Sequence, residues 1–202
     1  MDSGRTVGAD ANVLRVQAGW PGVWVDVVHG FGPSFELGGR VGFNYAFQGI
    51  VTNPPGLIGG GNGTELFFAL LLRQTLLELG SGTLAATFDP GLLLHFVSPP
   101  AGTGGGTTGT AISFPIGLQL GFPVAEKLVL NASVELPFFV TLPSGGGVGY
   151  LYIPILVGGG LEYRLQPSLL LTLKLAVGGT FGIDTHYEEF TLQAMAGVAY
   201  RF

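Results

Sequence analysis

Three histidines are the side chains of this chain best suited to acid–base chemistry near neutral pH. His29, His95 and His186 are its only imidazoles, and it has no cysteine. His95 is followed three positions later by Ser98, and His186 lies among carboxylates in "DTHYEE", residues 184–189. A hydrolase needs a nucleophile and a base held side by side, so either cluster is a candidate hydrolase site. Neither has a distinctive motif around it, which favours a protein that is not an enzyme.

The sequence offers little to hold a cofactor, a metal ion or a nucleic acid. The candidate ligands in "DTHYEE" lack a defined metal-binding spacing, and without cysteine there is no thiolate ligand or disulfide. The runs "GGGNG" and "GTGGGTTG" are not followed by the Lys-Ser/Thr pair of a phosphate-binding loop. A net charge of −5 without basic clusters argues against nucleic acid. We therefore predict no cofactor, no metal site and no nucleic-acid partner.

The composition indicates a membrane protein that does not cross the membrane with helices. Only 10% of the residues are charged, against about 25% in a typical soluble domain, and the mean hydropathy is +0.51. No apolar run approaches the roughly 18 residues that a transmembrane helix needs. The 36 glycines and 13 prolines disfavour long helices as well. The remaining structure that satisfies the backbone inside a bilayer is a closed β-barrel.

Segments in which apolar residues alternate with small or polar ones are the predicted strands of such a barrel. In "FELGGRVGFNYAF", residues 35–47, apolar side chains alternate with small or polar ones. Segments with the same clean alternation are 111–122, 128–140 and 169–180, and less regular ones are 64–79, 84–97 and 149–165. Tight turns and longer connections rich in Gly and Pro alternate between them, the longest at 50–64 and 98–110. This pattern predicts an all-β, single-domain, up-and-down antiparallel transmembrane barrel over residues 1–202.

The strand count depends on the N-terminal segment. Leu14 and Val16 are apolar at even positions, whereas Val23 and Val25 are apolar at odd positions, so the alternation breaks at "WPG", residues 20–22. A hairpin turn there gives about ten strands, with both chain ends on one side, and we favour this count. A bulge in one longer strand gives the alternative of eight. The first residues, "MDSGRTVGADAN", carry no apolar signal-peptide core, so we expect a mature form whose leader has been removed.

Most charged residues share the polar phase of these strands, which would face the lumen. The candidate lumen charge network consists of Arg15, Asp26, Glu36, Arg40, Glu65, Arg73, Asp89, Glu135, Glu162, Arg164 and Lys174. Both signs are well represented, and unpaired charges in a poorly hydrated interior are costly, so we expect ion pairs that fill the lumen. The alternative is a narrow polar channel in which Arg40 and Arg73 face the glutamates. A small apolar solute is a further alternative, since Phe67, Leu71 and Leu93 also fall on the inward phase.

The end of the chain, "TLQAMAGVAYRF", alternates apolar residues up to a final phenylalanine. With Val198, Tyr200 and Phe202 on one face, it resembles the C-terminal signal of bacterial outer-membrane β-barrel proteins. The resemblance implies a Gram-negative outer membrane, a multi-pass protein with both termini in the periplasm, and recognition by the barrel assembly machinery. The alternative is that Phe202 closes a soluble sheet.

Three function classes follow from these observations. The first, which we favour, is a small non-enzymatic outer-membrane barrel with a plugged lumen that presents surface loops. The second is a narrow channel or carrier for ions or a small, hydrophobic solute that the sequence does not identify. The third is a small membrane-embedded hydrolase built around His95 or His186.

Overall fold

The structure is a computed structural model that describes residues 7–45, 63–97, 107–142, 151–182 and 187–202. Its strands are β1 (Asn12–Trp20), β2 (Gly22–Gly30), β3 (Phe35–Asn44), β4 (Gly63–Leu79), β5 (Gly82–Phe88), β6 (Gly91–Val97), β7 (Thr107–Ala125), β8 (Leu128–Leu142), β9 (Leu151–Gln166), β10 (Leu169–Gly182) and β11 (Tyr187–Arg201). In the described part of the chain, no helix is long and apolar enough to cross a membrane.

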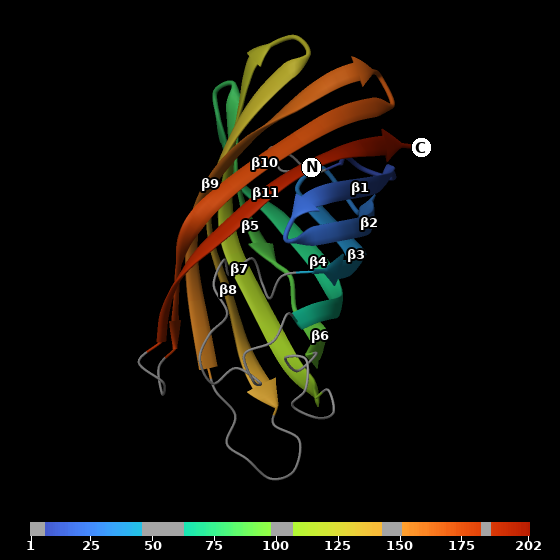
Figure 1. Ribbon diagram of the computed structural model, residues 1–202. Helices are drawn as coiled ribbons and strands as arrows, with labels where there is room; N and C mark the ends of the chain where they lie inside the picture. The colour runs from blue at the N-terminus through green and yellow to red at the C-terminus, as the bar shows by residue number, and fades with distance from the viewer. Residues whose placement is uncertain (1–6, 46–62, 98–106, 143–150, 183–186) are drawn as a thin grey trace.

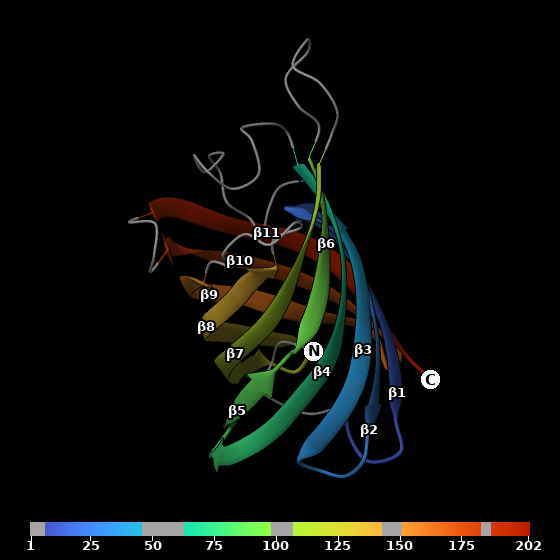
Figure 2. The ribbon, with the colours of Figure 1, turned by 90° about the horizontal axis from the view of Figure 1, so that it is seen from below.

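The strands form one closed antiparallel sheet (Figures 1 and 2). Each strand pairs with the next along the chain, except that β5 does not pair with β6, and β11 pairs with β1 through partners such as Val16 and Val198 to close the circle. Strands β5 and β6 are two halves of one wall strand, because both lie between β4 and β7 on either side of Asp89–Pro90. The predicted ten-stranded barrel is therefore confirmed.

The break in alternation near the N-terminus is a hairpin turn. Strands β1 and β2 pair antiparallel on the two sides of Pro21, with Ala18 opposite Val23. A proline cannot donate a backbone hydrogen bond, so it suits the turn better than the middle of a continuous strand. This pairing excludes the eight-stranded alternative.

The two ends of the barrel differ. The tight turns β2–β3, β4–β5, β7–β8 and β9–β10 lie at one end, which we call the turn end. The chain terminus lies there too, since Asn12 and Phe202 exchange two backbone hydrogen bonds of 3.0 and 3.1 Å. The opposite end, at which β3, β6, β8 and β10 stop, we call the loop end. Most of the connections at 50–64 and 98–110 lies outside the described residues.

The two faces of the wall differ as the alternation predicted. Large apolar side chains point outward and stay exposed around the barrel, with Val157 at 59% and Leu175 at 55% among the most exposed. A soluble monomer rarely exposes an apolar surface of this extent. The inward positions are buried and carry most of the charged and polar side chains. This outer face therefore matches a hydrocarbon surrounding rather than water.

Candidate functional site

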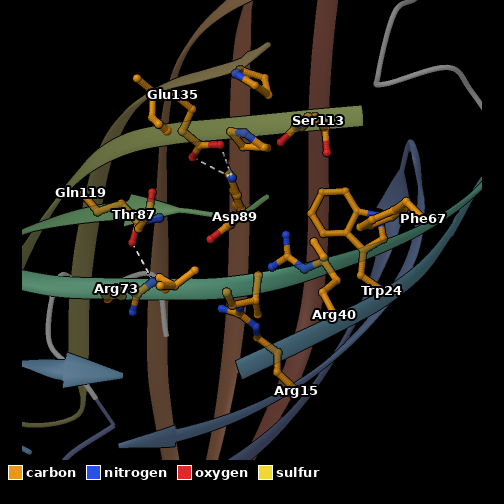
Figure 3. A pocket seen from close by; sticks show the side chains of 18 of the residues that line it. Arg15, Trp24, Arg40, Phe67, Arg73, Thr87, Asp89, Ser113, Gln119 and Glu135 are labelled. Carbon is orange, nitrogen blue, oxygen red and sulfur yellow. Dashed lines mark hydrogen bonds and ion pairs between the residues drawn. The ribbon is translucent and has the colours of Figure 1, made fainter. Parts of the chain in front are cut away.

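The candidate site is a central cavity of about 110 Å³ in the barrel lumen (Figure 3). Its lining includes Trp24, Arg40, Phe67, Asp89 and Glu135, which come from five different wall strands. A water molecule needs at least about 10–15 Å³ of such space, so the cavity has room for several waters. It is far smaller than the roughly 300–1,000 Å³ of pockets for drug-sized ligands.

A carboxylate shared by two guanidinium groups lies at one side of this cavity. Arg15, Asp26 and Arg40 are direct neighbours in register on β1, β2 and β3. Arg15 Nη2 lies 2.5 Å from Asp26 Oδ2, and Arg40 Nε lies 2.6 Å from Asp26 Oδ1. The Asp26 side chain is only 1% exposed. The single negative charge of Asp26 thus balances only part of the positive charge of Arg15 and Arg40.

Two further ion pairs lie elsewhere in the lumen, one between adjacent strands and one across an intervening strand. Arg73 on β4 lies 3.3 Å from Glu36 on β3 and donates a 2.7 Å hydrogen bond to Gln119 on β7. Lys174 on β10 pairs with Glu135 on β8 at 2.7 Å, although β9 separates these two strands. The Lys174–Glu135 contact passes over β9 at a point where the inward-facing residues of β9 are glycines. Lys174 lies opposite one of them, Gly160. These pairs bring charges of both signs against the same cavity.

A hydrogen-bonded chain continues from the cavity toward the loop end. The Trp24 indole N–H donates to Asn44 Oδ1 at 2.8 Å, and Asn44 Nδ2 donates to Glu65 Oε1 at 3.0 Å. His95 Nδ1 lies 3.4 Å from Glu65 Oε2, and the histidine is 2% exposed. His95 therefore belongs to the lumen network, a role that the sequence analysis missed. The signal was present, because His95 shares its strand phase with Leu93, which was assigned to the lumen.

The candidate hydrolase clusters lie partly outside the described residues. His95 is buried in the lumen, and Ser98 lies outside the described residues. His186 and the preceding Asp184 lie outside them too. His29 lies near the turn end, where its Nδ1 contacts Asn12 Oδ1 at 3.0 Å and its ring packs edge-on against Phe31. No group of three or more metal-ligating side chains occurs among the described residues.

Residues that precede the first strand fold into the lumen at the turn end. Val7 is buried in an apolar cluster with Val13, Val28, Leu71, Leu170 and Ala199. The Val7 backbone N–H donates a 2.8 Å hydrogen bond to Glu36 Oε2, which ties this segment to the Glu36–Arg73 pair. Backbone bonds from Asp10 N–H to the Gly30 carbonyl and from Gly30 N–H to the Ala11 carbonyl hold it to β2. We call residues 7–11 the plug segment, which no strand pattern in the sequence predicted.

A second apolar cluster lies toward the loop end. It contains Leu93, Ala111, Phe139 and Tyr152, with Phe67 packed against it. Phe139 and Tyr152 stack with their ring centroids 5.0 Å apart. Phe67, Leu71 and Leu93 face inward, as their strand phases predicted, and all three line the cavity. The polar middle of the lumen is thus bounded by apolar side chains on both sides.

The remaining members of the predicted charge network have different positions. Asp89 points into the cavity from the break between β5 and β6, where its backbone N–H bonds to the Pro115 carbonyl (Figure 3). Glu162 is buried in the half of β9 nearer the turn end. Arg164 is exposed near the end of β9, so its assignment to the lumen is corrected: the strand has passed beyond the enclosed interior there. The outward phase of Val198 and Tyr200 agrees with the predicted closing strand, and both are exposed.

The contact between Trp24 and Phe67 depends on a glycine. Gly42 lies between them in register, and a Cβ at this position would overlap the Phe67 ring and crowd Trp24. We expect Gly42→Ala to reduce the free energy of unfolding by about 1–3 kcal/mol, because the rings must leave their edge-to-face packing. Gly39→Ala on the same strand is the control, since the nearest atom to its Cβ is 4.0 Å away. Equal unfolding free energies for the two variants would contradict this account.

The closed sheet and its apolar outer face define the class of this chain: it is a transmembrane β-barrel of the outer-membrane type. No protein-family model and no curated protein matches the sequence. Among solved structures, it is similar to the outer membrane protease OmpT from Escherichia coli, with 10% identity, a TM-score of 0.58, and coverage of 97% of this chain and 98% of that one. This likeness shows the fold alone.

Two other outer-membrane proteins have weaker likenesses to this chain. OmpT of Vibrio cholerae matches at 15% identity and a TM-score of 0.39, over 98% of this chain and 62% of that one. The TodX monoaromatic hydrocarbon channel matches at 9% identity and a TM-score of 0.37, over 95% and 67%. Nothing about activity or cargo follows from either.

Proposed function

We propose that this chain is a non-enzymatic outer-membrane barrel that does not conduct ions and that acts through its loop end. The observation that carries this proposal is the plug segment, which places Val7 in an apolar cluster across the lumen. The ion pairs of Asp26, Glu36 and Glu135 support it, because paired charges leave few free groups to coordinate a passing ion. The buried position of His95 supports the absence of hydrolysis, since a substrate would have no direct access to it.

The proposal includes an orientation in the membrane. Outer-membrane barrels have short periplasmic turns and longer extracellular loops. We assign the turn end, with the chain terminus, to the periplasm and the loop end to the cell surface. The closing strand, with Tyr200 and Phe202 exposed on its outer face, is the segment that the barrel assembly machinery would bind. The surrounding partner is outer-membrane lipid.

Ion conduction in planar lipid bilayers tests the plugged lumen. We expect the folded, inserted protein to show no discrete openings, because the plug segment and the ion pairs occlude the lumen. Deleting residues 2–8 removes Val7, and Glu36→Gln removes the charge that holds both Val7 and Arg73. Both changes should produce openings, most clearly in combination.

The matched control for conduction is Glu126→Gln, which removes an exposed carboxylate from the β7–β8 turn and should remain silent. Openings in the unaltered protein whose size changes in Glu36→Gln or Arg40→Gln would instead establish a narrow channel. Hydrolysis of lipid or peptide that His95→Ala or His186→Ala abolishes would establish an enzyme.

A further inference from the structure

Three prolines form a row across the barrel wall. Pro115 on β7 lies directly opposite Pro137 on β8. Between β8 and β9 the paired residues are Glu135 with Leu156 and then Phe139 with Tyr152, and this register places Pro137 directly opposite Pro154. Pro115 and Pro137 line the central cavity, and Pro154 is fully buried. The row therefore lies on the lumen side of three adjacent strands.

This row removes two hydrogen bonds from one place between β8 and β9. In antiparallel sheets, the backbone groups of successive residues point to alternate neighbours. Pro115 accepts a hydrogen bond from Asp89 on the β5–β6 side, so Pro137 and Pro154 direct their backbone groups at each other. Neither has an N–H, so both bonds of this residue pair are missing. The three residues between Glu135 and Phe139 are thus unpaired, and the two flanking pairs lie about 14 Å apart at about 3.4 Å per residue.

The adjacent pairings do not share this weakness. Between β7 and β8 the register continues past Pro137 without a break, and between β9 and β10 it continues past Pro154. In hydrocarbon no water replaces the missing donors on the lipid side. The unpaired stretch, Leu136–Phe138 opposite Ile153–Ile155, is therefore a local weakness in the wall, which we call the β8–β9 seam.

The β8–β9 seam has apolar surroundings on its lipid side and, on its lumen side, toward the loop end. Ile155 points outward and is 43% exposed to the lipid face. On the lumen side, Pro137 lines the cavity together with Phe67 and Leu93, and the stacked Phe139 and Tyr152 border the seam toward the loop end. Toward the turn end the seam is bordered by Glu135, whose charge is paired with Lys174. The cavity volume of about 110 Å³ suits a thin chain better than a ring system or a headgroup.

We infer that the β8–β9 seam is a lateral entrance through which a single unbranched hydrocarbon chain passes from the membrane to the loop-end side of the central cavity, where Phe67 and Leu93 line it. The hydrocarbon chain belongs either to a membrane lipid or to a free fatty acid, since both offer the same chemistry to Phe67 and Leu93. This entrance is independent of ion conduction, because the plug segment closes the lumen at a different place.

Photolabelling with diazirine-bearing hydrocarbon chains tests the entrance. The folded protein is placed in phosphatidylcholine vesicles that contain either a phospholipid labelled on its acyl chain or a labelled free fatty acid. After irradiation, the labelled residues are mapped by mass spectrometry. We expect label on Phe67 and Leu93, which line the cavity, as well as on the outward-facing Val157, which is 59% exposed. Label on these inward residues from the phospholipid would mean that the hydrocarbon chain belongs to a membrane lipid. Label from the fatty acid would mean that it belongs to a free fatty acid.

Proline-to-alanine variants test the β8–β9 seam, because each substitution adds a backbone N–H donor to one strand. Pro137→Ala combined with Pro154→Ala restores both missing N–H groups, and we expect it to lose most of the inward label while keeping the label on Val157. Pro115→Ala restores a donor toward Asp89 and not toward β9, so it should keep the inward label. Circular dichroism and heat-dependent gel migration check that each variant is folded. The inference is overturned if neither arm labels inward residues, or if the double variant labels them as strongly as the unaltered protein.

Discussion

Replacing Asp26 with asparagine should lower the free energy of unfolding by about 3–5 kcal/mol, because it leaves two buried guanidinium groups without their shared carboxylate. The loss combines the desolvation of Arg15, whose side chain is 5% exposed, with the mutual repulsion of Arg15 and Arg40. Asparagine keeps the size of the side chain, so packing changes little. Equilibrium unfolding by urea in lipid vesicles, followed by tryptophan fluorescence, measures this free energy.

Two further variants separate the buried charge from charge in general. Glu126→Gln removes an exposed carboxylate and should change the unfolding free energy by no more than about 0.5 kcal/mol. Arg15→Met added to Asp26→Asn removes one of the two unpaired cations and should recover part of the loss. A loss for Asp26→Asn no larger than that for Glu126→Gln would mean that the shared carboxylate does not stabilise the barrel.

An arginine in place of Val157 should cost about 2–4 kcal/mol, because this residue points outward near the middle of β9, where the bilayer core is driest. Val157 is 59% exposed, so in a water-soluble barrel the same substitution would change stability by less than about 0.5 kcal/mol. The two surroundings thus predict clearly different unfolding free energies. The measurement is the same urea titration in vesicles.

Leu165→Arg is the matched control for the lipid-facing position. Leu165 also points outward on β9 but lies one residue from the end of the strand, where the cost of arginine falls to about 0–1 kcal/mol. A large effect at Val157 with a small effect at Leu165 maps the depth of the membrane along one strand. Small effects at both positions would contradict a transmembrane barrel.

The alternation of the sequence by itself determined which side of the wall each strand residue occupies. The side-chain period of a strand is two, so the apolar phase and the polar phase separate as soon as a segment is known to be a strand. The alternation placed Asp26, Glu36 and Arg40 inward without any structure. It failed for Arg164, because phase gives a face but does not say where along the strand the enclosed interior ends.

The number of strands is a property that the apolar pattern of the sequence does not determine. The phase break at Trp20–Gly22 is compatible with a turn or a bulge, because both shift the alternation by one residue. The pairing of Ala18 with Val23 decided for the turn. Pairing of this kind depends on contacts between two strands and cannot be read from the apolar pattern of either one.

Only the tertiary structure decided which inward groups meet. The pairing of Lys174 with Glu135 across β9, and the burial of the plug segment against Glu36, depend on register around the whole barrel. The same is true of the β8–β9 seam, since Pro137 and Pro154 remove two hydrogen bonds only because the register sets them opposite each other. The physical reason is that a strand's side-chain phase is a local property, whereas the height of each residue in a closed barrel is set jointly by all the strands and turns.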